Sequence, residues 1–284
     1  MFGSAKPPQV RSWLSPKTRT VVTHLLSVAK RTGAAIPHIV KVAASLKAMR
    51  RPPSRQAFLQ KVRREVEALT LPPPKGGWSE YYKDCFPSFS PSEEWTTKEH
   101  SVRQALLDSR PGSVLDIGSN VDWYSQLAAL LGCRVVAIDT DEGCVAQLYR
   151  DIKKKNLPIL PLVMDFRAPS PGYGLGNLAA LPATARLKCD MVMALALVHH
   201  LVFKQHLNFE QIIAGLSIFS TRWLLVEFIP REDMYVRDWW SERYSWYNLE
   251  NFVAVLRRHF HRVESYASFP DPRVLLLCEK KGTN

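Results

Sequence analysis

The stretch Val114-Leu115-Asp116-Ile117-Gly118-Ser119-Asn120-Val121-Asp122-Trp123-Tyr124-Ser125 predicts a strand, a tight turn and the start of a helix. Residues 114–117 have the length and apolar character of a short buried strand, and residues 123–131 carry apolar side chains at helical spacing. Gly118 lacks a Cβ, so the backbone can turn sharply there and approach a ligand. The N-terminus of the following helix offers free N–H groups. We therefore expect a loop that binds a nucleotide-containing cofactor.

A second apolar strand, residues 133–139, ends in an acid that fits such a cofactor. Asp139 follows Asp116 by 23 positions. An acid about 20 residues beyond the loop, at the end of the second strand, can accept hydrogen bonds from both ribose hydroxyls. The alternative is that Asp139 caps the next helix, but Thr140 and Asp141 stand closer to that helix. The order of strand, loop, helix, strand and acid favours a nucleoside site.

The loop resembles motif I of the class I S-adenosylmethionine-dependent methyltransferases, in which an acidic residue is followed by alternating glycines. Asp116 and Gly118 match this pattern, whereas Asn120 and Asp122 stand where further glycines are common. Asparagine tolerates left-handed backbone, so the first departure is mild. A carboxylate at position 122 suits a helix N-terminus, but it would repel the carboxylate of the cofactor. The resemblance extends over residues 100–280, including the Leu-Asp-Ile-Gly-Ser-Asn start and the later Ala-Leu-Val-His-His-Leu segment of nodulation-type bacterial methyltransferases.

The resemblance implies further cofactor contacts at the ends of later strands. In these methyltransferases an acid just past the third strand commonly contacts the adenine amino group. Asp165, followed by Phe166, matches that place after a predicted strand over residues 157–164. A fourth strand, residues 190–198, is nearly all apolar, as a central parallel strand should be, and is predicted to end at His199-His200. Ligands of open parallel sheets bind beyond the carboxyl ends of the strands, so these residues should converge at one edge.

The remaining pattern completes the expected fold class, which is α/β. Residues 209–219, capped by Asn208, and the residues from Asn248 to position 259 predict helices, and residues 224–228 predict a fifth strand. Residues 262–268 and 273–279 predict a closing β-hairpin. We therefore expect a Rossmann-like, seven-stranded, mostly parallel sheet whose last strand is antiparallel, preceded by an N-terminal helical extension.

The net charge of +12 arises from the N-terminal part of the 284-residue chain. Residues 1–64 contain 14 Lys or Arg and no acid, and predict three helices, near 15–33, 37–49 and 54–69, before a Pro-rich linker. We expect an extension over residues 1–75 and a methyltransferase-like domain over residues 76–284. Basic amphipathic helices can form a cap on the domain, lie on an anionic membrane, bind nucleic acid or act in targeting. All four alternatives remain open from the sequence.

The composition argues against a membrane-spanning protein and against a metal-binding or disulfide-bonded one. No apolar run reaches the roughly 18 residues that a transmembrane helix needs. Five cysteines are scattered without Cys-x-x-Cys spacing, and we interpret them as buried thiols in a reducing compartment, without metal. A cytoplasmic protein, with peripheral membrane contact as an option, is the expectation. The dense aromatics over residues 78–95 predict either a lid over a ligand or packing beneath a loop.

The expected chemistry is methyl transfer to a small-molecule acceptor, at oxygen. His199 or His200 would remove the proton of a hydroxyl, because an ordinary imidazole has a pKa of about 6.5. Glu227, at the end of the fifth strand, would orient the acceptor or else pair with a buried Arg or Lys. Aromatic residues over 235–247 would suit a flat or apolar acceptor or a sugar face. The alternatives are an RNA methyltransferase that uses the basic arm and a non-catalytic binding protein; the oligomeric state is left open.

Overall fold

The structure, a computed structural model, describes residues 52–69, 88–120 and 123–282. They fall into two units that we treat separately, one within residues 1–72 and one within residues 73–284. The first unit contributes helix α4 (Pro52–Glu67), which begins at a proline, a residue suited to a first helical turn. The two more N-terminal predicted helices, the linker and Asp122 lie outside the described residues. No described helix has the length and hydropathy needed to cross a membrane.

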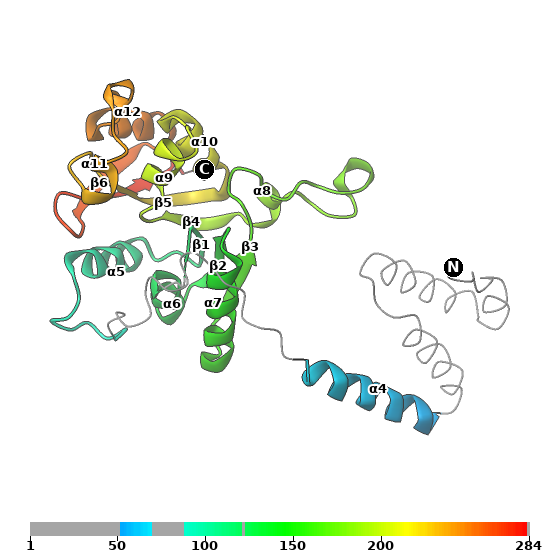
Figure 1. Ribbon diagram of the computed structural model, residues 1–284. Coiled ribbons are helices and arrows are strands. Elements are labelled where there is room, and N and C mark those ends of the chain that lie inside the picture. Colours follow the sequence, from blue (N-terminus) through cyan, green and yellow to red (C-terminus); the bar gives the residue numbers. More distant parts are fainter. Residues whose placement is uncertain (1–51, 70–87, 121–122, 283–284) are drawn as a thin grey trace, which may run out of the picture. The chain divides into compact units, whose positions relative to one another are not determined.

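The second unit is built on a seven-stranded sheet with the order β3-β2-β1-β4-β5-β7-β6 (Figure 1). Strands β1 to β5 are parallel, and β7 runs antiparallel to both β5 and β6. Their bounds are β1 Ser113–Ile117, β2 Arg134–Asp139, β3 Ile159–Val163, β4 Cys189–Ala194, β5 Ser220–Phe228, β6 Arg262–Ala267 and β7 Val274–Glu279. The predicted mostly parallel sheet with a closing antiparallel hairpin is confirmed.

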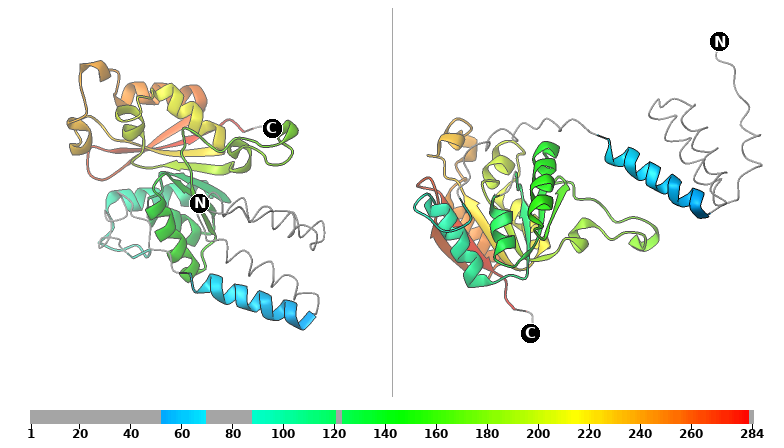
Figure 2. Two further views of the ribbon diagram at one scale, coloured as in Figure 1. Left: turned by 45° about the vertical axis from the view of Figure 1, so that its right-hand side comes forward. Right: turned by 90° about the horizontal axis from the view of Figure 1, so that it is seen from below.

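Helices cover both faces of this sheet (Figure 2). One face carries α5 (Thr97–Ser109), α6 (Trp123–Leu130) and α7 (Glu142–Lys155). The other carries α8 (Ala183–Arg186), α9 (Val198–Phe203), α10 (Phe209–Phe219), α11 (Met234–Arg237) and α12 (Leu249–His259). Short 3-10 turns occur at η1 (Leu175–Asn177) and η2 (Glu242–Tyr244). The predicted caps are confirmed: the side chains of Asp141, Asn208 and Asn248 accept backbone N–H groups at the starts of α7, α10 and α12.

Alternation along the central strands divides the core into two layers. On β1, Val114 packs with α5 and α6, whereas Leu115 and Ile117 pack with the layer of α9, α10 and α12. All three side chains are buried, and full burial of such a side chain contributes roughly 1.5–3 kcal/mol. Because both faces of β1 are covered, its carboxyl end is held firmly where the predicted loop begins.

One prediction at the fourth strand is wrong. Strand β4 ends at Ala194, and His199 and His200 lie in the first turn of α9 rather than at a strand end. The chain leaves the sheet early because Ala196 adopts a left-handed conformation with φ 48°, which ends extended pairing. The apolar run continues through Leu195 and Val198 because these residues are buried in the turn and in the helix. Apolar continuity therefore did not distinguish strand from buried helix.

Candidate cofactor and acceptor site

The turn after β1 has the geometry expected for a cofactor loop. Gly118 has φ +78°, and a Cβ built there would lie 3.1 Å from Cδ1 of Leu197. The N–H groups of Gly118 and Ser119 both donate to the Ile138 carbonyl, at 2.9 and 3.1 Å. Asn120 has φ 55°, so the left-handed conformation anticipated for it is present. The loop is thus bent at two left-handed positions, Gly118 and Asn120, and fastened to β2.

Asp116 and Asp139 support this loop from the ends of β1 and β2. Asp116 is buried and accepts a hydrogen bond from Ser125 Oγ at 3.0 Å, which joins β1 to α6. The carboxylate of Asp139 accepts the N–H of Asn120 at 2.8 Å through Oδ2 and the N–H of Asp141 at 2.8 Å through Oδ1. Each carboxylate oxygen has two lone pairs, so each retains the capacity to accept a ligand hydroxyl. The side chain that caps α7 is that of Asp141.

The third acid lies beside this pair of strand ends. The N–H of Met164 donates to the Asp139 carbonyl at 2.9 Å, so Asp165, the next residue, lies near the carboxyl end of β2. Arg167 binds the Asp165 carboxylate in a bidentate manner, with Nε at 3.1 Å and Nη2 at 2.6 Å from its oxygens. This hydrogen bonding holds the pKa of Asp165 below its usual range, so the group is a carboxylate. The Phe166 ring packs against Gly215 of α10.

His199 is buried, at 3% exposure, and its Nδ1 has no hydrogen-bond partner among the described residues. Burial lowers its pKa to about 2, and nearby His200, Arg273 and Lys98 add to the effect. The pKa of His200 is also lowered, first by burial and then by Lys204. The two rings lie 4.2 Å apart, centroid to centroid. Both imidazoles are therefore neutral, with one unsatisfied ring nitrogen on His199.

Glu227 pairs with a buried lysine, which is one of the two roles that the sequence predicted for it. Its Oε2 lies 2.6 Å from Lys98 Nζ and also accepts the Ala196 N–H at 2.8 Å, while Oε1 accepts Ser268 Oγ at 2.7 Å. The Glu227 side chain is 0% exposed and that of Lys98 is 11% exposed. These bonds fasten the left-handed turn at Ala196, three residues before His199. Glu227 thus fixes the segment that carries the histidines.

A second buried ion pair closes the same region. Arg273 Nε lies 2.7 Å from Asp233 Oδ2, and the two side chains are 10% and 2% exposed. Asp233 also caps α11 by accepting the Tyr235 N–H at 2.9 Å. Burial opposes the charge of Arg273, but its hydrogen bond to Asp233 and the nearby Glu227 raise its pKa overall, so Arg273 is a cation.

The aromatic clusters divide between core and site. Phe89 and Trp95 pack on Trp123 of α6 with ring centroids 5.3 and 5.1 Å apart, so these two members contribute to hydrophobic packing. The rest of the first cluster lies outside the described residues. In the second cluster Tyr244 and Tyr247 are buried in the core, whereas Trp239 stacks on His199 with centroids 6.0 Å apart. Trp239 is therefore the member of this cluster that lies at the histidines.

Sequence reasoning missed Lys98, Leu197, Asp233 and Arg273. Lys98 stands 129 positions from Glu227, and nothing in its helical surroundings distinguishes it from a solvated lysine. Leu197 stands two positions before His199, so it is the one of the four that the sequence could have indicated. Within the described ranges no three His, Cys, Asp or Glu side chains group as a metal site. The four described cysteines are free and buried, as anticipated.

This strand order, with an antiparallel β7 and a glycine turn after β1, is the Rossmann-like fold of the class I S-adenosylmethionine-dependent methyltransferases. The resemblance recognised in the sequence is thereby confirmed at the level of the fold. A curated relative comes from a bacterium. Nodulation protein NoeA of Rhizobium meliloti (strain 1021) is 26% identical over 187 residues, which cover 64% of this chain and 39% of NoeA. The chain therefore matches about two-fifths of the length of that relative.

Three solved structures have similar folds. Magnesium protoporphyrin IX methyltransferase (ChlM) from Synechocystis PCC 6803, with bound SAH, is 16% identical with a TM-score of 0.46, covering 64% of this chain and 81% of ChlM. The bifunctional kinase-methyltransferase WbdD is 15% identical with a TM-score of 0.46, covering 63% and 38%. TehB from Haemophilus influenzae is 16% identical with a TM-score of 0.46, covering 67% and 64%. No family model matches the chain.

Proposed function

We propose that this protein is an S-adenosylmethionine-dependent methyltransferase that acts on a small-molecule acceptor, at oxygen. One observation carries the proposal: the Gly118 turn, the Asp139 carboxylate and the neutral His199 lie beyond the carboxyl ends of neighbouring parallel strands. Open parallel sheets bind their ligands at that edge. The relatives support the same reading, since ChlM by its name is a methyltransferase and was solved with SAH bound.

The cofactor supplies an activated methyl carbon when it is bound, and the protein holds and orients it. Asp139 would accept hydrogen bonds from the two ribose hydroxyls with the lone pairs that the backbone N–H groups leave available. Gly118 would let the backbone approach the cofactor because it has no Cβ; Leu197 already lies against that position. Asp165, which is paired with Arg167, would accept a hydrogen bond from the adenine amino group. Asn120 completes the loop, and Phe166 would adjoin the adenine from its packing position.

The acceptor side is formed by the histidines and the residues that position them. The unsatisfied Nδ1 of His199 would accept a hydrogen bond from an acceptor hydroxyl and orient it toward the methyl carbon. As the methyl carbon bonds to the oxygen, the proton would move along this hydrogen bond to Nδ1 of His199. His200, whose half-buried ring lies 4.2 Å away between centroids, is the alternative base if the hydroxyl donates to it instead. Glu227 would act as a positioning residue, since all its described bonds hold the turn before His199 and the neighbouring segments. Trp239 would offer its ring to a flat or sugar-like acceptor.

Cofactor binding is the most direct test because it needs no knowledge of the acceptor. Isothermal titration of the full chain with S-adenosylhomocysteine should give a dissociation constant in the micromolar range. S-adenosylhomocysteine should bind better than adenosine alone, since the latter lacks the amino-acid part. No heat at high protein concentration, with a folded sample, would reject the enzyme and would make Asp122 the residue to examine.

An RNA methyltransferase is the second candidate, and the sequence observation that favours it is the basic segment of residues 1–64, with 14 Lys or Arg and no acid. Phosphate contacts predict that log affinity falls with log salt by about 0.7 for each contact with a single strand. Fluorescence anisotropy with single-stranded RNA at several salt concentrations distinguishes the two. Affinity that is absent, or that does not change with salt, excludes RNA.

A non-catalytic binding protein is the third candidate, favoured by the carboxylate at position 122. It predicts folded protein without affinity for S-adenosylhomocysteine. Peripheral membrane contact through the N-terminal helices would then be a separate property, and deletion of residues 1–70 should weaken co-sedimentation with vesicles. Equal sedimentation of the two chains would exclude that role for the extension.

A further inference from the structure

The connection from β3 to β4 forms a projecting arm, which we define as residues 168–182 (Figure 1). A helix usually covers the sheet in such a crossover, but here the described helices are the four residues of α8 and the three-residue turn η1. The arm is tied to itself: Tyr173 N–H donates to the Ala180 carbonyl at 2.8 Å, and Ala180 N–H returns the bond at 3.1 Å. At its base, Ala183 N–H donates to the Ser170 carbonyl at 2.8 Å. The arm is an ordered hairpin-like element.

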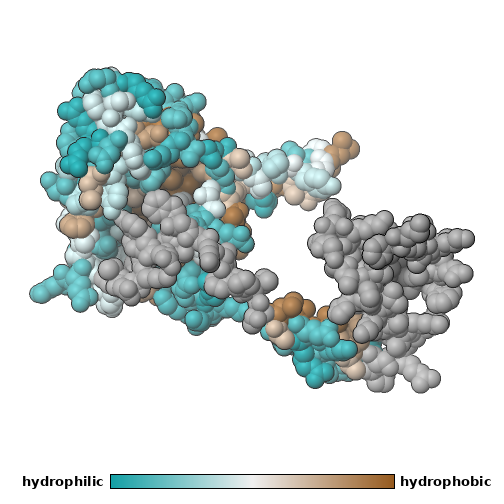
Figure 3. All heavy atoms as spheres, in the orientation of Figure 1, coloured by the Kyte–Doolittle hydropathy of each residue, from teal (hydrophilic) through white to brown (hydrophobic). Residues whose placement is uncertain are grey.

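The tip of the arm is apolar and exposed. Leu175 is 91% exposed and Leu178 is 88% exposed, and Tyr173 and Leu181 add further exposed apolar surface. Figure 3 shows apolar residues gathered at the end of the projection. Residues 168–185, eighteen in all, include no charged side chain. Large apolar side chains held this far out of the core mark a binding surface rather than a folding requirement.

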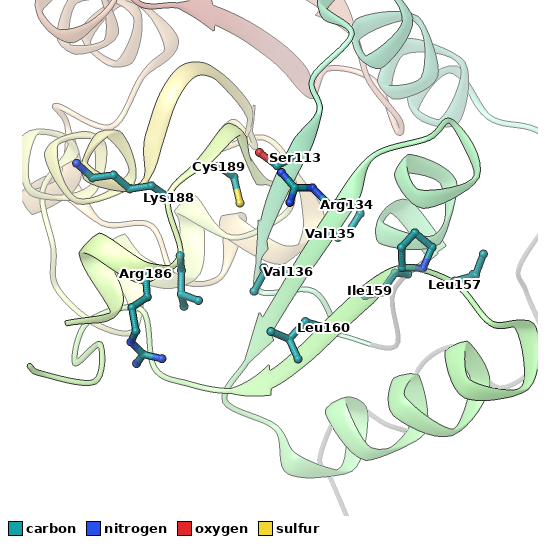
Figure 4. Close-up of a pocket in the computed structure, with 12 residues that line it drawn as sticks. Ser113, Arg134, Val135, Val136, Leu157, Ile159, Leu160, Arg186, Lys188 and Cys189 are labelled. Atoms are coloured by element: carbon teal, nitrogen blue, oxygen red, sulfur yellow. The ribbon is translucent and has the colours of Figure 1, made fainter. Parts of the chain in front are cut away.

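Cations surround the base of this arm. Arg186 is fixed there, since its Nε donates to the Leu181 carbonyl at 2.7 Å and its Nη2 to Ser170 Oγ at 2.9 Å. Arg134 and Lys188 line the same open cavity of about 440 Å³, Arg134 from the start of β2 and Lys188 from the segment before β4, with its side chain extending away from Arg134 (Figure 4). The floor of that cavity is apolar, with Val136 and Leu160 from the uncovered face of β2 and β3. No acidic residue lines the cavity.

An uncharged apolar tip ahead of a basic base is the arrangement by which proteins dock on anionic lipid. We propose that the arm inserts its tip, Leu175 and Leu178, into the interface of an anionic lipid bilayer while Arg134, Arg186 and Lys188 face the headgroups. Charge complementarity favours this occupant over the chain's own residues 1–64, which carry only positive charge. The surface belongs to the unit of residues 73–284 and does not depend on methyl transfer.

A probe on the arm itself tests the proposal, because the basic N-terminal segment can hold the protein on vesicles without it. Leu178→Cys is labelled with an environment-sensitive fluorophore in the full chain, in a Cys85→Ser background; the other cysteines are buried. With vesicles of phosphatidylcholine and phosphatidylglycerol the emission should shift to the blue and be quenched by lipid-borne quenchers. Pure phosphatidylcholine should give a much smaller shift.

Two comparisons make the readout specific. The same label at Tyr149→Cys, an exposed position on α7 on the opposite sheet face, should not shift. Leu175→Ser should weaken the partitioning reported by the label at position 178 at least about tenfold. Burial of one leucine side chain contributes more free energy than a tenfold change in the partition coefficient requires. Lys188→Gln should weaken it by a smaller factor that vanishes at high salt.

Either of two results overturns the proposal. The label at position 178 could remain unchanged while the protein sediments with anionic vesicles, in which case the arm does not reach the lipid. Alternatively, the emission could shift without vesicles as protein concentration rises, together with a dimer in analytical ultracentrifugation. That result would assign the arm to a second copy of the chain.

Discussion

The two ends of the parallel sheet use the same bonds for different purposes. At the carboxyl end, Asp139 accepts two backbone N–H groups, from Asn120 and Asp141, each at 2.8 Å. At the amino end, Asp190 likewise accepts two, from Gly112 and Ser113, at 2.9 and 3.0 Å. A carboxylate that fastens a loop is therefore not evidence of a site. What distinguishes the carboxyl end is the turn at Gly118, where Leu197 lies against the missing Cβ, together with the buried Nδ1 of His199, which has no hydrogen-bond partner among the described residues.

The same contrast applies to glycines and to ion pairs. Gly118 at the carboxyl end and Gly132 before β2 both have positive φ, but only Gly118 has a side chain within 4 Å of its missing Cβ. Glu227 is paired in full burial with Lys98, whereas Glu279 is paired with an Arg222 that is 61% exposed. Each pair of residues therefore supplies one variant at the carboxyl end of the sheet and a matched control elsewhere.

The largest expected effect is on the buried ion pair. Glu227→Gln keeps the shape of the side chain but leaves Lys98 as an uncompensated buried charge. Breaking a buried pair in this way costs about 3–5 kcal/mol, so the free energy of unfolding in urea should fall by roughly that amount. Glu279→Gln should change it by less than about 1 kcal/mol, because its partner is exposed. Equal effects would contradict the distinction between the two ends.

The neutral state of His199 makes stability depend on pH in a known direction. Its folded pKa, about 2, is lower than the unfolded value of about 6.5. Below that unfolded pKa the unfolded chain binds a proton that the folded chain does not, so stability falls as pH falls. The slope is about 1.4 kcal/mol per pH unit for one such group. His199→Gln should reduce the slope between pH 6 and 5 by that amount, measured by urea unfolding at each pH; an unchanged slope would show that His199 is protonated in the fold.

A smaller effect on stability is expected from the glycines, with a sharper effect on binding. Gly118→Ala and Gly132→Ala both place a Cβ in left-handed backbone, which costs about 1–2 kcal/mol per residue. Gly118→Ala should lower the thermal stability at least as much as Gly132→Ala, because its Cβ would also lie 3.1 Å from Cδ1 of Leu197. Only Gly118→Ala should weaken S-adenosylhomocysteine, by at least about tenfold, because its methyl group would press on Leu197 inside the loop. Loss of affinity in both variants would indicate a general destabilisation.

Sequence reasoning located the elements wherever a local signal was present. Apolar runs defined the central strands, and Asp141, Asn208 and Asn248 marked helix starts with side chains that accept backbone N–H groups. The positive φ of Asn120 followed from the tolerance of asparagine for that conformation. The boundary of β4 did not follow, because alanine at position 196 gives no sign of a left-handed turn. That turn is held by Glu227, which is distant in the chain.

The candidate site was predictable to a lesser extent. Its acids follow strands, so the parallel topology alone brought Asp116, Asp139 and Asp165 to one edge. Lys98 and Arg273 could not be placed, because ion pairs between remote segments depend on how the helix and the hairpin pack. The exposed leucines of the arm could not be predicted, since its Gly and Pro residues indicate an irregular segment but not where the leucine side chains point.

The proposed cofactor site depends most on ribose binding by Asp139, and one titration tests that role most directly. Asp139→Ala and Asp190→Ala each remove a carboxylate that accepts two backbone N–H groups, so both should lower stability to a similar extent. Calorimetry with S-adenosylhomocysteine should show affinity at least about tenfold weaker for Asp139→Ala, since hydrogen bonds to a charged group contribute roughly 1.5–3 kcal/mol each. Asp190→Ala should bind like the parent. A folded Asp139→Ala variant that binds as tightly as the parent would place the cofactor elsewhere.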